Sequence, residues 1–391
     1  MFSSRTDWPL VPNRLAELLH QRWASGLPIL DLTESNPTRC GFAVDIEEVL
    51  APLHHPHALT YEPDPRGLRA AREAVANYYS ERGARLDPDQ IFLTASTSEA
   101  YSFVFRLLAN PGDKILVPQP SYPLFEFLGA LNDVEVIPYP LVYADGWQVD
   151  LHALASRCAA RARAVLVVHP NNPTGSFLRE RERVWIMELC RRQRAALVAD
   201  EVFADYALAT NVGCVTTHAQ DGAALTFTLS GLSKICALPQ MKLGWVVVNG
   251  PPPLRQEAIG RLEVIADTYL SVSAPVAWAA PVWLERRHAI QSQILERVRA
   301  NLRQLDDMLI PGLPVTRLKV AGGWYAILRV PATRSDEEWA AEFLSQDGVS
   351  VHPGHFYDFP SDGYLVLSLL PPLNVFARAL NRIIARVCAR S

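Results

Sequence analysis

The sequence contains no uninterrupted run of about 18 apolar residues, the length that a membrane-spanning helix requires. Residues 1–12 also lack the apolar core of a secretory signal peptide. The six cysteines are scattered without a C-x-x-C pair, and a chain of 391 residues can bury a core large enough to fold without disulfides. We therefore expect a cytoplasmic protein that is neither exported nor inserted into a membrane.

An excess of positive charge is missing as well. The chain has 37 basic and 41 acidic residues, a net charge of -4, and no basic stripe of the kind that binds nucleic acid. The spacing of the cysteines does not suggest a metal site either. These absences predict small molecules as partners, and an anionic ligand must then be bound by a local group of residues.

Short apolar segments alternate with helical patterns between residues 91 and 248. The segment 164–168 is apolar throughout, which is typical of a strand in a parallel sheet that is covered on both faces. This alternation predicts one large α/β domain with a mostly parallel sheet over residues 42–284. Beyond Pro281, the sequence predicts a long charged helix at residues 283–309, and mixed strands and helices follow it. We therefore expect residues 285–391 to form a smaller α+β domain, packed with the N-terminal segment 1–41.

Polar motifs follow several of the predicted strands. They are His-Pro-Asn-Asn-Pro-Thr-Gly at residues 169–175, Asp-Glu-Val at 200–202, and Leu-Ser-Gly-Leu-Ser-Lys at 229–234. A fourth, Ser96-x-x-Glu99, has the form of a capping box, and the N-terminus of its helix offers free N–H groups to an anion. Because ligands of open α/β sheets bind at the carboxyl ends of strands, we expect these motifs to face one pocket.

Lys234 has the position expected of a lysine that forms an imine. It follows a β-rich segment at 223–229, with small hydroxyl residues around it and Gly231 ending the strand. A protonated lysine is a weak nucleophile, but partial burial lowers its pKa and frees the lone pair to react with an aldehyde. A lone lysine is more often a solvated surface charge, so the interpretation depends on the other motifs.

Together, the Asn-Pro-Thr-Gly, Asp-Glu-Val and Ser-Lys motifs in this order resemble the fold-type I pyridoxal-phosphate (PLP) enzymes, the class I and II aminotransferases. The resemblance covers nearly the whole chain, from Asn36 to the final helix. It implies a three-layer PLP-transferase-like fold, with a large mostly parallel sheet domain and a smaller C-terminal α+β domain. It also implies pyridoxal 5'-phosphate as the cofactor.

The resemblance implies roles for individual residues. Lys234 corresponds to the lysine that forms the Schiff base and later moves the proton, and Asp200 to the partner of the pyridine nitrogen. Tyr122 corresponds to the aromatic residue that stacks on the ring. The other residues implied in cofactor binding are Asn172 at the phenolic oxygen, and Ser96, Thr97, Ser230 or Ser233, and Lys242 at the phosphate. Tyr61 matches the tyrosine that reaches the phosphate from a partner subunit, which implies a homodimer.

The sequence departs from the family pattern at four positions. Lys242 stands where an arginine is usual, Ser96 where glycine is frequent, and Phe203 where a tyrosine usually contacts the phenolic oxygen. At the fourth position, Val366 replaces the arginine that binds the substrate carboxylate. The predicted substrate-binding residues are Asn36, Arg39, Asn172 and Arg329; the sequence does not decide between the two arginines, or whether the substrate has a carboxylate there.

The predicted function is therefore transfer of an amino group between an amino acid, or a modified amine, and a 2-oxo acid. Poor activity with aspartate, glutamate and aromatic amino acids is expected. Another PLP reaction, as in a Cβ lyase, a synthase or a decarboxylase, needs the same lysine and aspartate and stays an alternative. A PLP-sensing regulatory module would need an N-terminal DNA-binding domain, for which the segment before Phe42 is too short.

Overall fold

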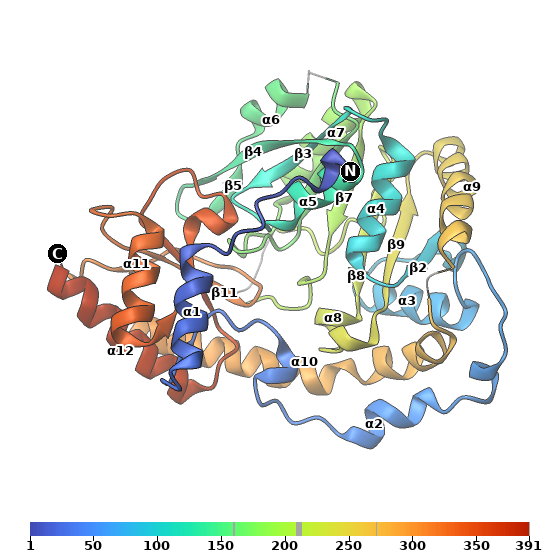
Figure 1. Ribbon diagram of the computed structural model, residues 1–391. Coiled ribbons are helices and arrows are strands. Elements are labelled where there is room, and N and C mark those ends of the chain that lie inside the picture. Colours follow the sequence, from blue (N-terminus) through green and yellow to red (C-terminus); the bar gives the residue numbers. More distant parts are fainter. Residues whose placement is uncertain (159–160, 209–212, 271, 391) are drawn as a thin grey trace.

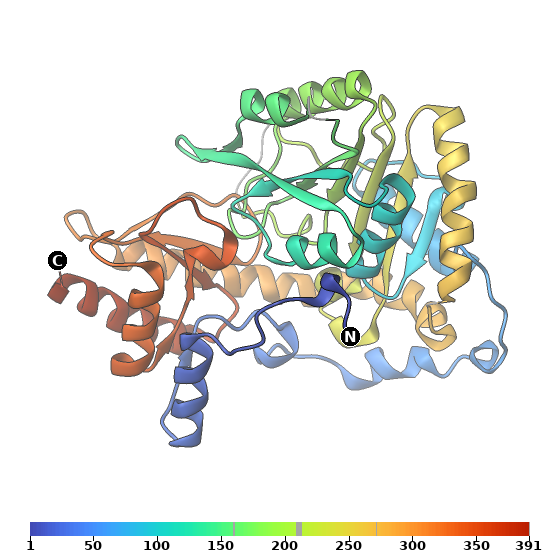
Figure 2. The ribbon, with the colours of Figure 1, turned by 45° about the horizontal axis from the view of Figure 1, so that its top comes forward.

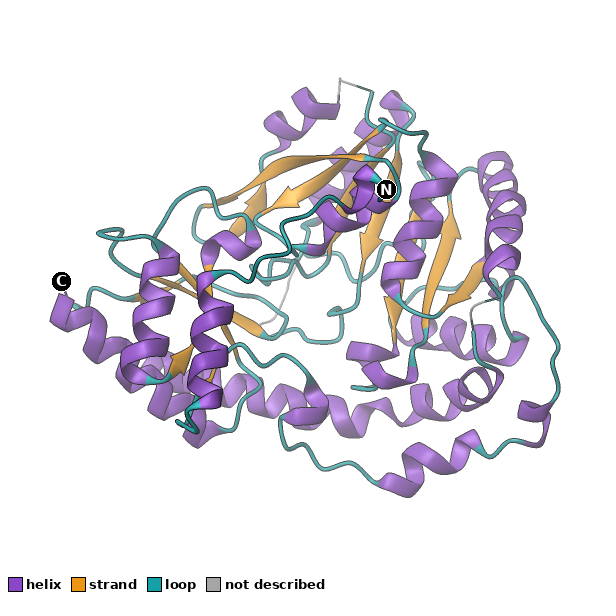
Figure 3. Cartoon of the chain, viewed as in Figure 1, coloured by secondary structure: helices purple, strands orange, loops and turns teal. Residues whose placement is uncertain are grey.

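The computed structural model describes residues 1–158, 161–208, 213–270 and 272–390. The chain forms a large domain around an eight-stranded sheet and a smaller domain at the other end of one long helix (Figure 1). Helices lie on both sides of the large sheet, as Figure 3 shows. The prediction of a three-layer α/β fold with a smaller C-terminal domain is confirmed.

The order of strands in the large sheet is β2-β9-β8-β7-β6-β3-β4-β5. Their bounds are β2 Ile91–Thr94, β3 Lys114–Gln119, β4 Glu135–Tyr143, β5 Trp147–Val149, β6 Ala164–Val168, β7 Ala196–Asp200, β8 Thr226–Gly231 and β9 Gly244–Asn249. The contiguous strands β4, β3, β6, β7 and β8 are parallel. β9 runs antiparallel to β2 and to β8, and β5 runs antiparallel to β4.

The central strands are apolar throughout because both faces of the sheet are covered. In β6, Val165 and Val167 belong to one buried cluster, whereas Leu166 and Val168 belong to another on the opposite face. The helices of the large domain are α3 Arg69–Glu81, α4 Thr97–Leu108, α5 Leu124–Leu131, α6 Leu151–Cys158, α7 Glu180–Gln193, α8 Leu232–Ile235 and α9 Pro252–Tyr269. Helices α4, α5 and α9 cover the Leu166 face, and α6 and α7 cover the Val165 face (Figure 2). Each strand therefore contributes alternate side chains to two cores.

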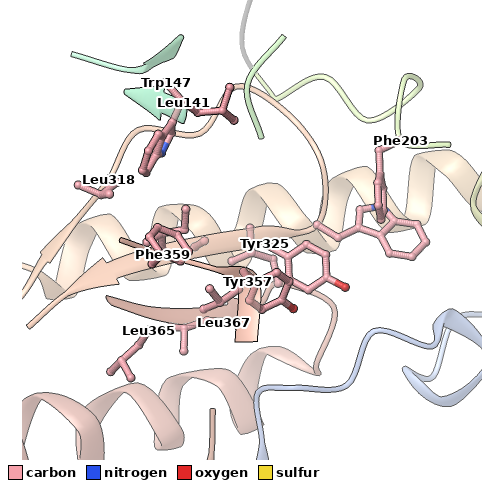
Figure 4. Close-up of a cluster of buried hydrophobic side chains, with 14 of the residues drawn as sticks. Leu141, Trp147, Phe203, Leu318, Tyr325, Tyr357, Phe359, Leu365 and Leu367 are labelled. Atoms are coloured by element: carbon pink, nitrogen blue, oxygen red, sulfur yellow. The ribbon is translucent and has the colours of Figure 1, made fainter. Parts of the chain in front are cut away.

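The small domain packs two helices against an antiparallel sheet. The order of strands in this sheet is β10-β11-β14-β13, with bounds Thr316–Arg317, Tyr325–Arg329, Tyr364–Ser368 and His352–Pro353. Helices α11 Asp336–Glu342 and α12 Leu373–Arg390 accompany it. Residues of both domains share one buried cluster (Figure 4), in which the ring centroids of Trp147 and Phe359 are 5.9 Å apart.

The N-terminal segment contacts both domains. Its helix α1 (Arg14–Ala24) lies beside α11, and its strand β1 (Leu30–Asp31) pairs in parallel with β12 (Val349–Ser350) of the small domain. Before α1, the Arg5 guanidinium bonds the carboxylate of Asp133 in the large domain. A short helix, α2 (Ile46–Leu50), then leads back to the large domain.

The long helix α10 (Ala274–Met308) runs along the lower side of the molecule and joins the two domains (Figure 1). The sequence predicts its start only after Pro281, because proline usually breaks a helix interior. In the structure the helix begins earlier and continues through Pro281. The predicted domain boundary at residue 284 therefore falls inside one helix. No helix in the described parts of the chain is long and apolar enough to cross a membrane.

Candidate active site

A cavity of about 150 Å³ lies at the carboxyl ends of β6, β7 and β8, beside the N-terminus of α4. Three of the four predicted strand-end motifs contribute side chains to it, and so does the first turn of α4. Its polar lining residues are Ser35, Thr97, Ser98, Asn172, Asp200, Ser233 and Lys234, and its aromatic lining residues are Tyr101, Tyr122, Phe125, Phe203 and Tyr325. The expectation that the motifs share one pocket agrees with this geometry.

Lys234 lies on α8, directly after β8, with its side chain inside this cavity. The Nζ atom is 5.5 Å from the ring centroid of Phe203 and 5.0 Å from that of Trp324. The Tyr206 hydroxyl donates to the Lys234 carbonyl oxygen at 2.6 Å and so anchors the short helix. Burial lowers the pKa of Lys234 to about 8, although the nearby Asp200 carboxylate opposes this shift. A large fraction of the amine is therefore neutral and nucleophilic at mildly alkaline pH.

This lowered pKa leads to a prediction for the cofactor-free protein. Lys234 should react with a small amine-directed reagent with a midpoint at about pH 8, because deprotonation limits the reaction. Mass spectrometry of the labelled peptides over a pH series measures this midpoint, and peptides with the three other lysines serve as internal references. A midpoint for Lys234 no lower than that of the surface lysines would contradict the described burial.

Asp200 ends β7 and is 7% exposed. Its Oδ1 accepts from the Val202 N–H at 3.0 Å, and its Oδ2 accepts from the Tyr101 hydroxyl at 2.7 Å. Burial raises the pKa of Asp200, whereas the two hydrogen bonds and the charge of Lys234 lower it. The carboxylate therefore lies at the cavity wall in a fixed orientation.

The N-terminus of α4 borders the cavity. Ser96 caps the helix in an extended conformation (φ -170°), and its Oγ accepts from the Glu99 N–H at 3.1 Å. The Glu99 carboxylate accepts from the Ala95 N–H at 2.7 Å, one residue before the position that a capping box requires. Because its hydroxyl is used for capping, Ser96 does not line the cavity, whereas Thr97 and Ser98 do. Ser98 was not among the residues predicted from the sequence.

The strand β9 approaches this helix end closely. A Cβ on Gly244 would come within 3.0 Å of the Ser96 carbonyl carbon and 3.1 Å of the Thr97 nitrogen. A glycine is therefore needed here for space, so that the N-terminus of α4 can lie against the sheet beside Lys234. A larger residue would push the two elements apart.

Of three other residues predicted to bind the cofactor, only Asn172 lines the cavity, whereas Ser230 and Lys242 do not. Asn172 lines the cavity, and its Oδ1 is buried without a partner among the described residues. Ser230 turns its hydroxyl to the Glu201 carbonyl oxygen at 3.4 Å, so Ser233 is the serine of this segment that lines the cavity. Lys242 is exposed on the turn before β9 and does not line the cavity.

Aromatic side chains form the walls of the cavity. Phe203 is buried edge-on against Trp324, with 5.2 Å between ring centroids. Tyr122 also lines the cavity and is 42% exposed, so its ring is accessible to a ligand. Tyr325 contributes from the small domain and lies beside Tyr357, with 6.4 Å between ring centroids (Figure 4).

Tyr61 lies outside this cavity. It is 74% exposed and lines a separate hollow of about 350 Å³ together with Trp278 and other residues before α3 and at the start of α10. A single chain therefore does not bring Tyr61 to Lys234.

A further hollow, distinct from the one at Tyr61, has a volume of about 420 Å³ and adjoins the cavity, as shown by Ser35 and Lys234, which line both. Asn36 and Arg39 lie on its wall, and Arg39 is the last residue of a short 3-10 helix, η2 (Pro37–Arg39). We refer to this hollow as the outer groove. It is open, so it offers a route from Lys234 to solvent.

The two predicted arginines have different surroundings. Arg39 lines the outer groove. Arg329 lines neither the cavity nor the outer groove, and its guanidinium lies over the Tyr364 ring, 5.0 Å from the centroid. Tyr325, four residues earlier on β11, reaches the cavity; four residues span roughly 13 Å along a strand. Val366 is fully buried in β14 between Ile327 and His352 and offers no polar group.

Tyr101 is the principal site residue that the sequence analysis missed. It lies four residues after Thr97 on α4, and residues at this spacing occupy the same face of a helix. The spacing was visible in the sequence, but only the fold shows that this face meets Asp200. Tyr325 was missed because it belongs to the other domain.

Comparisons with known proteins agree with this geometry. The model of the family described as aminotransferase class I and II matches residues 36–374. The alanine aminotransferase of Mycobacterium tuberculosis is 29% identical over 92% of this chain and 86% of its own length. For the glutamate-pyruvate aminotransferase AlaA of Haemophilus influenzae, the identity is 28% over 92% of this chain and 90% of its own length.

Solved structures share the fold. An aminotransferase from Escherichia coli superposes with a TM-score of 0.87 at 24% identity, over 99% of this chain and 98% of that one. The alanine aminotransferase from Pyrococcus furiosus gives a TM-score of 0.87 at 21% identity, over 99% of each chain. The fold and the family match together define a class of enzyme that transfers amino groups.

The chain belongs to the aminotransferase class I and II family, whose members are PLP-dependent enzymes. The predictions of this family and of PLP-dependent amino-group transfer are confirmed.

Proposed function

We propose that the cavity around Lys234 binds pyridoxal phosphate and that the outer groove binds the carboxylate of the amino donor through Arg39. The residues present fit the cofactor. The Asn172 Oδ1 is a buried polar atom that lacks a partner among the described residues, as expected of a side chain that contacts a ligand. The buried amine of Lys234 and the carboxylate of Asp200 occupy the same cavity.

Each polar residue then has a role. Lys234 would bind the cofactor covalently, Asp200 would hold a proton on its ring nitrogen, and Tyr122 would stack on the ring. Asn172 would donate to its phenolic oxygen through the amide NH₂ group. The N–H groups and hydroxyls of Thr97 and Ser98, with Ser233, would bind the phosphate at the N-terminus of α4. Phe203 would form part of the cavity wall, whereas Ser96 and Ser230 would act indirectly, through the cap of α4 and the bond to the Glu201 carbonyl oxygen. Lys242 is exposed outside the cavity and has no contact role there within one chain.

When bound, pyridoxal phosphate supplies an electron-poor ring that stabilises negative charge on the carbon next to the substrate nitrogen. Lys234 would remove and return the proton at that carbon, since its pKa of about 8 lets it act as acid and base near neutral pH. The aromatic rings of Phe203 and Trp324 would hold its ammonium form by cation–π contact.

The position of Arg39 supports its proposed role. Among the described residues that line the cavity or the outer groove, Lys234 and Arg39 are the only cations. The Arg39 side chain makes no ion pair with any described residue. Its guanidinium is therefore free to pair with a carboxylate, which the apolar Val366 of β14 cannot do.

The relatives' names suggest the first substrates to test, with alanine and glutamate as amino donors and pyruvate as an acceptor. Alanine, glutamate and pyruvate each carry the carboxylate that Arg39 would bind. Alanine as donor, with a 2-oxo acid other than its own product pyruvate as acceptor, is our first pair, because the sequence predicts poor activity with glutamate, aspartate and aromatic amino acids. A panel that includes amines without a carboxylate tests both expectations together.

Arg39→Ala should lower kcat/KM for carboxylate-bearing donors by about 10- to 100-fold, the effect of losing one charge-assisted pair. Arg329→Ala removes an arginine that lines neither the cavity nor the outer groove, so it should leave kcat/KM nearly unchanged. Single-turnover kinetics with each donor measure both variants. Equal rates for Arg39→Ala and the unmodified protein would show that another group binds the carboxylate or that the true substrate has none.

We also propose a homodimer in which Tyr61 completes the partner's phosphate site. The large hollow around Tyr61 and Trp278, with Leu59 95% exposed beside it, supports an apolar contact surface in this region. The six free cysteines agree with the predicted cytoplasmic location.

A further inference from the structure

Tyr101 makes the closest contact to the Asp200 carboxylate. Its hydroxyl lies 2.7 Å from Asp200 Oδ2, and the residue is only 2% exposed. Its ring is fixed by Phe105 and Phe125, with centroids 5.8 Å and 5.6 Å away. The phenol therefore cannot turn aside when the cavity fills, so the hydrogen bond belongs to a rigid part of the site.

The proton in this hydrogen bond stays on the tyrosine. Burial, and then the Asp200 charge, raise the pKa of Tyr101 well above its ordinary value, so the phenol remains the donor. Burial alone would favour a protonated Asp200, and the Tyr101 hydrogen bond is the largest influence that opposes it. The Val202 N–H and the charge of Lys234 also lower the pKa of Asp200. Tyr122 is a further titratable group that interacts with Asp200, whose charge raises the pKa of the Tyr122 phenol after the larger effect of burial.

The two hydrogen bonds also fix how the carboxylate is turned. Each oxygen of Asp200 receives one donor, Val202 N–H at Oδ1 and Tyr101 O–H at Oδ2. A carboxylate has about four acceptor positions, so each oxygen keeps one free for a further N–H in the cavity.

We propose that Tyr101 is a positioning residue that keeps Asp200 ionised and correctly turned to hold a proton on the ring nitrogen of the cofactor. This inference rests on the proposed role of Asp200. A purely structural tyrosine would also bury its ring and satisfy its hydroxyl, but it would not influence how cofactor affinity depends on pH.

The test is the dissociation constant of pyridoxal phosphate for the full chain, measured by fluorescence from pH 5.5 to 9. Tyr101→Phe keeps the ring contacts with Phe105 and Phe125 and removes only the hydroxyl. Without this donor the pKa of Asp200 rises, so the carboxylate becomes protonated at a higher pH as the solution is acidified. We expect the dissociation constant to be about 10-fold higher at neutral pH, and the loss of affinity on acidification to begin about one pH unit higher.

Tyr139→Phe is the matched control. Tyr139 is 1% exposed and donates to the Leu166 carbonyl oxygen at 2.8 Å, so this variant also loses one buried hydroxyl bond, but none to Asp200. It should lower thermal stability and leave the pH profile of cofactor binding unchanged. If Tyr101→Phe has the same profile as Tyr139→Phe, the inference is wrong.

Asp200→Asn separates this inference from the proposed function. If this variant binds cofactor and turns over like the unmodified protein, the role of Asp200 itself fails. If it loses activity as expected, Tyr101→Phe should add little in the Asp200→Asn background, because the two residues act together. Full additivity of the two losses would overturn the role of Tyr101 while leaving the proposed function intact.

Discussion

Lys234→Ala is expected to reduce amino-group transfer by about 10⁴-fold or more, because it removes both the covalent attachment point and the proton-transfer group. The fold should survive, since one side chain is removed at the edge of a cavity while Tyr206 still bonds the backbone of α8. Steady-state rates and a thermal melt measure the two effects.

Lys114→Ala provides the control for Lys234→Ala. Lys114 lies on the surface at the start of β3, with its ammonium 3.8 Å from the Glu135 carboxylate, and it has no contact with the cavity. Its replacement should leave the rates unchanged. A Lys234→Ala protein that kept the visible absorbance band of the bound cofactor would contradict the assignment of this lysine.

Asp200→Asn is expected to lower turnover by about 100-fold or more while weakening cofactor binding less severely. An amide cannot hold a proton on the ring nitrogen, so the ring becomes a poorer electron sink. The amide would also present an N–H₂ or an oxygen to the Tyr101 hydroxyl, and the carboxylate's two acceptor contacts could not both be kept. Turnover and the dissociation constant of the cofactor should be measured on the same preparation.

Asp336→Asn is the matched control for Asp200→Asn. Asp336 is also buried, at 1% exposure, and accepts from the Tyr364 N–H at 3.0 Å, but it lies in the small domain away from the cavity. Its replacement should affect stability and not turnover. Near-normal turnover of Asp200→Asn would mean that this aspartate only stabilises the turn at Val202.

The sequence predicted the parts of the fold that local pattern determines. The segment 164–168 is apolar throughout because alternate residues enter two cores, so its strand and its neighbours could be recognised. The direction of β9 could not be predicted, since an apolar run has the same pattern in both directions. Helix α9 was missed because it begins within the prolines at 251–253 and lacks a strong apolar stripe.

In the site, too, the residues in local motifs could be predicted, whereas contacts between distant segments could not. The motifs at the ends of β6, β7 and β8 are local, and the fold brings Asn172, Asp200 and Lys234 into one cavity. Tyr101 meets Asp200 across 99 residues of sequence, and no local pattern reports such a contact. The choice between Arg39 and Arg329 likewise depends on whether η2 or the end of β11 lies beside the cavity, which is a property of the assembled domains.

The most direct test of the central claim is reduction of the purified protein with borohydride, followed by digestion and mass spectrometry. A Schiff base between cofactor and lysine becomes a stable secondary amine on reduction, so the modified residue keeps the mass of the reduced cofactor. We predict this mass on Lys234 itself, located by fragmentation of the peptide, and on none of Lys114, Lys242 and Lys319. An unmodified Lys234 peptide in a protein that retains cofactor and activity, or modification of another lysine instead, would contradict the account.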